Sequence, residues 1–159
     1  FDAPVTFTTQ TSGPGTIVTS TLWIDATSVN VANNNYDDNE KEFIVPGGTL
    51  GIDNAVRVVC YRIRNGGNPR IRVRYGGQVF YETGNLGSNP SSRFEIIIFG
   101  NGATNQQKSF IDDANTGANG QRFGTTSVNS AVDQTVEIQM RGSGSVLDFC
   151  SAETLIIGN

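Results

Sequence analysis

The arginines of this chain are concentrated in one short stretch, and they are its most distinctive chemical feature. Six of the nine arginines fall between positions 57 and 74. Guanidinium groups on alternating strand positions present paired hydrogen-bond donors that suit sulfate, carboxylate or phosphate groups. We expect a hairpin closed by Gly66 and Gly67 to place two groups of them side by side. The candidate residues for anion or subunit contact are Arg62, Arg64, Arg70, Arg72 and Arg74.

Arginines held side by side repel one another unless anions neutralise them. The alternative to an anion site is therefore pairing with acidic residues, such as Glu82, Glu95 or Glu137, on neighbouring strands or subunits. The net charge of −4 supplies enough carboxylates for this. We interpret the arginine face as a contact surface inside an assembly rather than a substrate site.

The remaining reactive residues exclude several kinds of chemistry. The chain has no histidine, which removes Ser-His-Asp and Cys-His catalysis and His-ligated zinc. Two cysteines cannot complete a zinc or iron–sulfur site alone, so Cys60 and Cys150 are expected to be a disulfide or two buried thiols. Paired carboxylates can hydrolyse glycosides, but fifteen acids always provide some pair. We expect no enzyme, no cofactor and no metal.

Aromatic and acidic loop residues offer a weaker alternative, a sugar-binding surface. Tyr36 lies among asparagines and acids, and with Asp37 and Asp38 it forms a candidate glycan-binding rim. A sugar-stacking platform is a further alternative, formed by Trp23, Tyr36, Tyr61, Tyr75 and Tyr81. Trp23 lies between Leu22 and Ile24, which favours core packing over stacking on a sugar. The acidic segments 37–40 and 112–115 lack EF-hand spacing and are interpreted as solvated turns. Lys41 and Lys108 are interpreted as ordinary exposed lysines.

Composition indicates the kind of scaffold that positions these residues. The 159 residues are the size of one domain, and Gly, Asn, Thr and Ser together account for 63 of them. These residue types disfavour helix interiors. No apolar run is long enough for a membrane helix, and the acidic pI near 4.7 argues against nucleic-acid binding. Because the chain opens on Phe1 without a signal-peptide pattern, we interpret it as a processed product, a fragment or a recombinant chain.

Alternating apolar and polar residues, interrupted by turn residues, predict short strands throughout. Residues 70–75 and 78–82 are expected to form a hairpin around Gly76-Gly77. Residues 134–141 alternate as well, while 94–99 and 155–157 are nearly continuous and predict strands that are apolar on both faces. The further expected strands are 15–24, 42–45, 55–64, 109–111, 122–128 and 146–150. This spacing predicts an all-β, jelly-roll-like antiparallel sandwich over 15–159, preceded by an N-terminal arm or edge strand at 1–14.

The stretch from Phe43 to Lys108 resembles small jelly-roll domains in virion proteins of tailed phages. The segments that carry the resemblance are Phe43–Gly51, Asp53–Val58, Arg72–Gly77, Arg93–Ile98 and the turn Asn101–Lys108. It implies a capsid-decoration, tail-fibre or spike domain that assembles as a homo-oligomer, often a trimer. The arginine block is heavier than in that pattern.

The resemblance also implies partners and location. We expect self-association, contacts with other virion proteins, a host-surface glycan at exposed loops, and no nucleic acid or membrane. Location in a virion made in a reducing cytoplasm favours free thiols at Cys60 and Cys150. The competing interpretation is a secreted, extracellular carbohydrate-binding domain or lectin that acts as a monomer.

Overall fold

The described part of the chain consists of strands and connecting turns. The computed structural model describes residues 17–32, 34–36, 40–52, 54–64, 69–82, 91–113 and 123–157, with the backbone alone at 17–18, 62–64, 91–92, 112–113 and 157. The expected arm at 1–14 lies outside these residues. The strands are β1 (Ile17–Asp25), β2 (Val29–Val31), β3 (Lys41–Val45), β4 (Ala55–Arg64), β5 (Arg70–Tyr75), β6 (Gln78–Glu82), β7 (Ser91–Gly100), β8 (Gln107–Asp113), β9 (Phe123–Thr126), β10 (Gln134–Arg141) and β11 (Ser145–Ile157).

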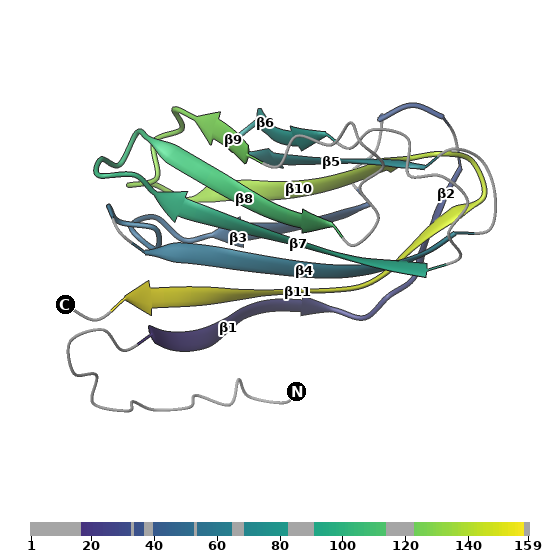
Figure 1. The fold of residues 1–159 in the computed structure, drawn as a ribbon, viewed down its shortest axis with the longest axis horizontal. Coiled ribbons are helices and arrows are strands. Elements are labelled where there is room, and N and C mark those ends of the chain that lie inside the picture. The colour runs from purple at the N-terminus through teal and green to yellow at the C-terminus, as the bar shows by residue number, and fades with distance from the viewer. Residues whose placement is uncertain are drawn as a thin grey trace.

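Two antiparallel sheets face each other, which confirms the predicted sandwich (Figure 1). The large sheet has the order β1-β11-β4-β7-β8-β9, with β2 also paired to β11, and the small sheet has the order β3-β10-β5-β6. The first and last strands are neighbours, and the chain crosses between sheets so that β3 pairs with β10 and β4 with β11. This connectivity is that of a jelly roll, with β8 and β9 added to the large sheet beyond β7.

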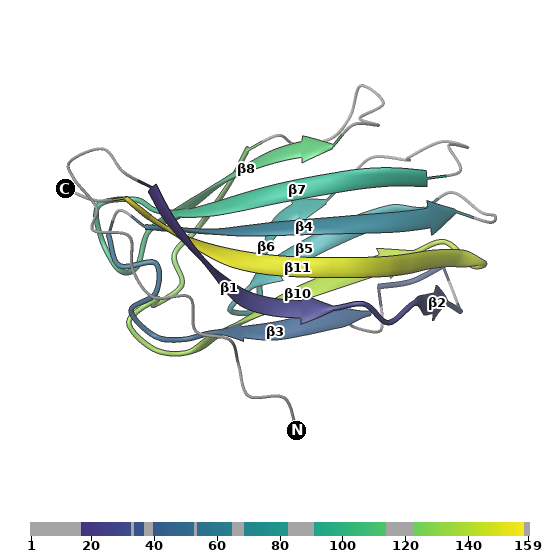
Figure 2. The same cartoon turned by 90° about the horizontal axis from the view of Figure 1, so that it is seen from below.

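The core lies between the sheets and follows the alternation of side chains along each strand. In β10 the expected inward residues Val136, Ile138 and Met140 are fully buried. In β7 the burial also alternates: Ile96 and Ile98 face the core, whereas Ile97 and Phe99 lie half-buried on the outer face. The expected continuous burial of this strand is therefore only half correct. Figure 2 shows the large sheet in front of the small one.

The turn between β5 and β6 confirms the predicted hairpin. Gly76 and Gly77 both have positive φ, at 52° and 78°, as a type I′ turn requires. A Cβ at Gly76 would also meet the Val128 side chain at 2.3 Å. Glycine is therefore needed there for both conformation and space.

The predicted hairpin between 55–64 and 70–75 is wrong. β4 lies in the large sheet between β11 and β7, whereas β5 lies in the small sheet between β10 and β6. The two strands therefore belong to different sheets and do not pair with each other. The reason is that β4 finds longer partners in β7 and β11, which pair with it along nearly its whole length.

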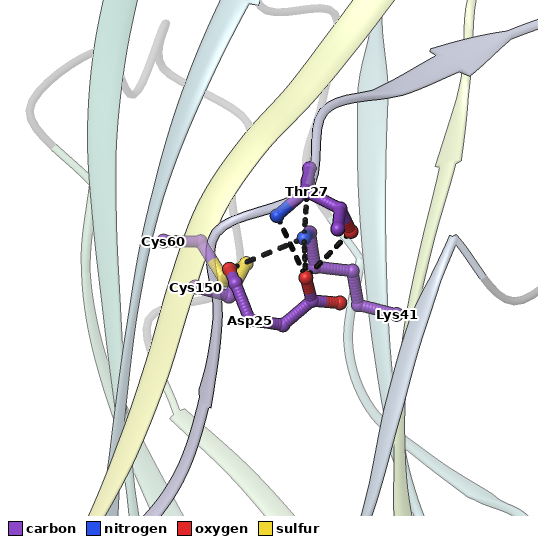
Figure 3. The surroundings of a disulfide bond; sticks show 5 residues. All are labelled: Asp25, Thr27, Lys41, Cys60 and Cys150. Carbon is purple, nitrogen blue, oxygen red and sulfur yellow. Dashed lines mark hydrogen bonds and ion pairs between the residues drawn. A yellow bond between two sulfur atoms is a disulfide. The ribbon is translucent and has the colours of Figure 1, made fainter. Parts of the chain in front are cut away.

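Cys60 and Cys150 form a disulfide across the centre of the large sheet (Figure 3). The two residues are direct partners in the β4–β11 pairing, and their Cα atoms lie 4.2 Å apart. Both are fully buried. The expectation of free thiols is therefore wrong, because the strand register brings both side chains to the same place on the inner face.

A buried lysine joins the two sheets beside this disulfide. The Lys41 ammonium group donates hydrogen bonds to the Thr27 carbonyl oxygen at 2.6 Å and to the Asp25 carbonyl oxygen at 3.3 Å, and it lies 3.1 Å from the Asp25 carboxylate (Figure 3). Its side chain is fully buried. The interpretation of Lys41 as an exposed lysine is wrong. The available signal was its phase, because Lys41 precedes Phe43 and Val45 at the two-residue spacing of the inward face.

The disulfide predicts a defined result on alkylation and mutation. Denatured, non-reduced protein should gain no alkyl group, because both sulfurs are bonded. The double variant Cys60→Ser, Cys150→Ser should lose roughly 2–5 kcal/mol of stability in urea unfolding, because the bridge closes a long loop. Two added alkyl groups on the wild-type chain would contradict the bridge.

Removing the buried ammonium group should be costly. Lys41→Met should destabilise the chain by about 3 kcal/mol or more, because it removes the ammonium donor from the Asp25 and Thr27 carbonyl oxygens and the ion partner from the Asp25 carboxylate. Lys108→Met is the matched control, since Lys108 is exposed on β8, and should change stability by no more than about 0.5 kcal/mol. Urea unfolding measures the stability of both variants. Equal losses of stability would show that the Lys41 contacts between the two sheets do not stabilise the fold.

Candidate functional site

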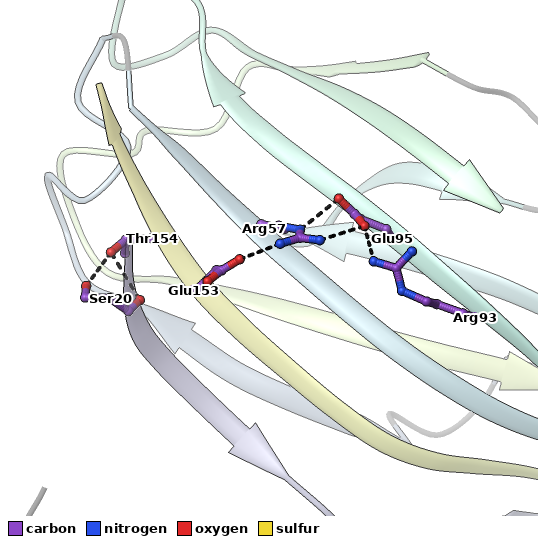
Figure 4. Close-up of polar contacts among 6 residues, drawn as sticks. All are labelled: Ser20, Arg57, Arg93, Glu95, Glu153 and Thr154. Carbon is purple, nitrogen blue, oxygen red and sulfur yellow. Dashed lines mark hydrogen bonds and ion pairs between the residues drawn. The ribbon is translucent and has the colours of Figure 1, made fainter. Parts of the chain in front are cut away.

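A network of four charged side chains crosses the outer face of the large sheet (Figure 4). Arg57 on β4 donates to both Glu95 oxygens, at 2.8 and 3.1 Å, and to Glu153 on β11 at 2.8 Å. Arg93 donates a further hydrogen bond to Glu95. The strands set this order, because Glu153 and Arg57 are direct partners in the β11–β4 pairing.

The network fixes the protonation of its members. The hydrogen bonds from Arg57 are the main cause that lowers the pKa of Glu95 below its ordinary value, and burial opposes them. The same bonds, with those to Glu153, raise the pKa of Arg57. Both groups are therefore charged at neutral pH, and the four side chains sum to zero net charge.

An aromatic pair stands beside the network on the same face. The rings of Tyr61 on β4 and Phe149 on β11 are 6.1 Å apart and tilted by 49°. Tyr61 is 47% exposed, which is high for so large a side chain within a strand. Phe149 lies where the β4–β11 register shifts, between Leu147 and Cys150.

Two irregularities in strand pairing border these residues. In β11, two residues, Asp148 and Phe149, stand opposite Tyr61 alone, which is the arrangement of a β-bulge. In the neighbouring strand β1, the register to β11 shifts between Thr21 and Trp23. Bulges bend a strand and re-aim its side chains, and they are enriched beside functional sites.

The aromatic pair and three members of the charged network, Arg57, Arg93 and Glu153, line one groove, which we call the Tyr61 groove. It has a cavity volume of about 330 Å³ and opens on the outer face of the large sheet. Strands β1, β4, β7 and β11 each contribute to it. Its lining residues are Thr21, Ile24, Arg57, Val59, Tyr61, Arg93, Phe149, Ser151, Ala152 and Glu153.

The predicted arginine face is divided by the fold. Arg70, Arg72 and Arg74 lie on β5 in the small sheet, whereas Arg62 and Arg64 lie on β4 in the large sheet, and the side chains of these two are outside the described residues. Arg72 pairs with Glu82 at 2.9 Å and Arg74 with Glu137 at 3.1 Å. With Arg57–Glu95, these ion pairs show the expected pairing with acidic residues of neighbouring strands for three arginines of the block, Arg57, Arg72 and Arg74.

Tyr36 contacts Arg72 of the block and a further arginine, Arg141. The Arg72 guanidinium carbon lies 4.0 Å from the centre of the Tyr36 ring, and that of Arg141 lies 5.2 Å from it. Burial is the main cause that raises the pKa of Tyr36 to about 12. The ring therefore holds residues 34–36 against the small sheet by cation–π contacts. Asp37 and Asp38, the rest of the candidate glycan rim, lie outside the described residues.

The other aromatic candidates are placed in or against the core. Trp23 stacks on Phe43 with ring centres 4.8 Å apart, and Tyr75 and Tyr81 are fully buried. The preference for core packing of Trp23 is confirmed. Within the described residues, no three side chains of His, Cys, Asp or Glu are grouped as a metal site, and no helix could cross a membrane.

Sequence reasoning missed the Tyr61 groove as a unit. Tyr61 was considered as one of several aromatic residues, but Phe149 was not paired with it. The burial pattern of β11 gives the reason: inward residues occupy odd positions at Ser145 and Leu147 and even positions at Cys150 and Ala152. A change of phase inside a strand marks a bulge. The bulge in β11 brings Phe149 beside Tyr61, which is far away in the sequence.

The lowered pKa of Glu95 predicts acid-sensitive stability. A carboxylate whose pKa is lower in the folded state stabilises that state above its unfolded pKa, and this contribution is lost as the pH falls through the folded value. The difference in unfolding free energy between wild type and Glu95→Gln should therefore be largest near pH 7 and shrink below about pH 4. Urea unfolding at several pH values measures it, and a constant difference would contradict the role of the charge.

No protein-family model matches the chain, and no curated protein matches it either. The resemblance to phage virion domains therefore stays a prediction.

Proposed function

We propose that this chain is a non-catalytic structural domain of a virion, in a capsid decoration, a tail fibre or a spike. In this proposal it assembles with copies of itself, as a trimer, contacts other virion proteins and presents exposed loops to a host-surface glycan. The jelly-roll strand order supports the proposal, because it is the fold that the sequence resemblance implies. Since one fold serves many functions, the proposal needs a surface that a second copy could contact.

The observation that carries self-association is an apolar row at one side of the large sheet. Ile97, Phe110 and Phe123 are direct partners across β7, β8 and β9 on the outer face. Phe110 is 40% exposed and Phe123 is 71% exposed, and their rings are 5.7 Å apart. Exposed aromatic clusters of this kind are typical of protein interfaces.

A stable end of the sandwich supports the architectural role. The turn after β3 and the segment before β10 are joined by hydrogen bonds from Gly48 to Ser130 and from Gly47 to the Asp133 carboxylate, both 2.8 Å. The buried Gln107 amide bonds to Thr104 and Val128, at 3.0 and 2.8 Å. Loops tied to one another in this way form a rigid end, which suits a domain that packs into a particle.

The competing proposal is a secreted carbohydrate-binding domain that acts as a monomer. Two observations favour it: the aromatic and charged lining of the Tyr61 groove, and the disulfide. Disulfides persist in oxidising environments, which include secreted proteins and also the surfaces of virions. The disulfide is therefore consistent with both proposals, and the oligomeric state separates them.

Light scattering after size-exclusion chromatography tests self-association. We expect a mass near three times 17.0 kDa. Phe123→Ser should weaken association by at least about tenfold, since buried aromatic side chains carry much of the binding energy at interfaces. Val132→Ser is the control, because Val132 is also more than half exposed but lies outside the apolar row. A wild-type chain that stays at 17.0 kDa at every concentration would contradict the proposal.

A further inference from the structure

We propose that the Tyr61 groove binds a neutral saccharide of one or two pyranose units. In this proposal the exposed ring of Tyr61, supported by Phe149, packs against the apolar C–H face of a sugar ring. Side chains of the charged network hold its hydroxyl groups. This site goes beyond the structural role proposed above and does not depend on the oligomeric state.

The aromatic pair supplies the stacking surface. Tyr61 lies at the interior of the large sheet, with β11 on one side and β7 on the other, yet its ring is nearly half exposed. Phe149 supports it from the neighbouring strand at a ring distance of 6.1 Å. An amphipathic aromatic side chain held in place by packing offers a large contact area at little cost in conformational entropy.

The charged network supplies both donors and acceptors. Glu95 accepts from Arg57 twice and from Arg93 once, and its side chain is only 15% exposed, so it serves to hold the two arginines. Glu153 uses one oxygen for Arg57 and is 31% exposed, and Arg93 is 39% exposed. Among the described contacts, one Glu153 oxygen and the remaining Arg93 N–H groups stay available to a ligand. A sugar hydroxyl can both donate to the first and accept from the second.

Charge and shape favour a neutral sugar over other ligands. The two arginines and two glutamates cancel, so the groove offers no excess positive charge to a phosphate or sulfate chain. An extended peptide would add to an unpaired strand edge, whereas this groove lies over the face of strands that are already paired. Its volume of about 330 Å³ is at the lower end of the range for small-molecule sites, roughly 300–1,000 Å³.

The two bulges explain why the groove exists on a sheet face. A regular β11 would alternate from Leu147 to Cys150 without a break and would place one of the two cysteines on the outer face. The bulge keeps the disulfide inside and adds one residue at Phe149, beside Tyr61. The second bulge, in β1, lies between Thr21 and Ile24, which line the opposite side of the groove. The groove therefore results from the bulges in β1 and β11.

Backbone amide chemical shifts of the folded chain, titrated with maltose, cellobiose and lactose, test the proposal. At roughly 10 mM sugar, at least one of the three should shift the amides of β4 and β11 near Tyr61 and Phe149. Sialyllactose and a heparin disaccharide are the charged counterparts. If only these bind, or if no neutral sugar shifts amides around the groove, the proposal is wrong.

Three variants distinguish sugar binding in the groove from nonspecific binding and from a loss of folding. Tyr61→Ala should weaken the binding of the responding sugar at least tenfold, about 1.4 kcal/mol, while Tyr61→Phe should retain it because the ring remains. Ile44→Ala is the control: it removes an exposed large apolar residue on β3, outside the groove and outside the apolar row, and should leave sugar binding unchanged. Binding that survives Tyr61→Ala in a folded chain, or that is lost in Ile44→Ala, would overturn the assignment.

The same experiment distinguishes this inference from the structural proposal. A chain that forms trimers but binds no neutral sugar contradicts only the groove. A monomer that binds sugar through Tyr61 contradicts only self-association. The groove variants change Tyr61 on β4, whereas the association variant changes Phe123 on β9, so each result is assigned to one proposal.

Discussion

The pairing of β11 with β4 is the constraint on which the rest of the structure depends. It places Cys60 beside Cys150 in the core, and on the opposite face it places Arg57 beside Glu153 and Tyr61 beside Phe149. β11 also pairs with β1 and β2, so it joins both early strands of the chain to the sheet. One strand therefore sets the disulfide, the charged network and the aromatic pair together.

Local features of the fold were predictable because their causes are local. The β5–β6 hairpin follows from two adjacent glycines with positive φ between alternating segments, and the inward residues of β10 follow from their spacing. The jelly-roll strand order confirms the predicted class for the same reason, since a chain of short amphipathic strands has few other ways to bury one face of each.

Partner choice could not be predicted in the same way. A Gly-rich segment between two strands favours a hairpin locally, but β4 gains more by pairing with β7 and β11, which are distant in sequence. The state of the cysteines depended on that same choice, because only direct pairing brings Cys60 against Cys150. Lys41 was misjudged because a charged residue was assumed to be exposed, although its position in the alternation indicated the interior.

The residues that carry the resemblance to phage domains have mostly structural roles here. Gly47 has no room for a Cβ, which would lie 2.6 Å from the Ala131 carbonyl oxygen, and Gln107 holds the neighbouring loop through its buried amide. These residues shape the turns at one end of the sandwich, so a shared pattern of this kind speaks to fold. The residues of the Tyr61 groove lie largely apart from those turns, and their chemistry has to be judged from the groove itself.

The charged side chains are arranged differently on the outer faces of the two sheets. In the small sheet, Arg72 pairs with Glu82 and Arg74 with Glu137, and Arg72 also contacts Tyr36. These two arginines therefore bind partners on neighbouring strands of their own sheet. The large sheet differs because its row of direct partners changes from polar to apolar: Glu153 and Arg57 are followed by Ile97, Phe110 and Phe123. The proposed sugar site, over β11 and β4, and the proposed self-association surface, over β7 to β9, therefore occupy separate places on one face.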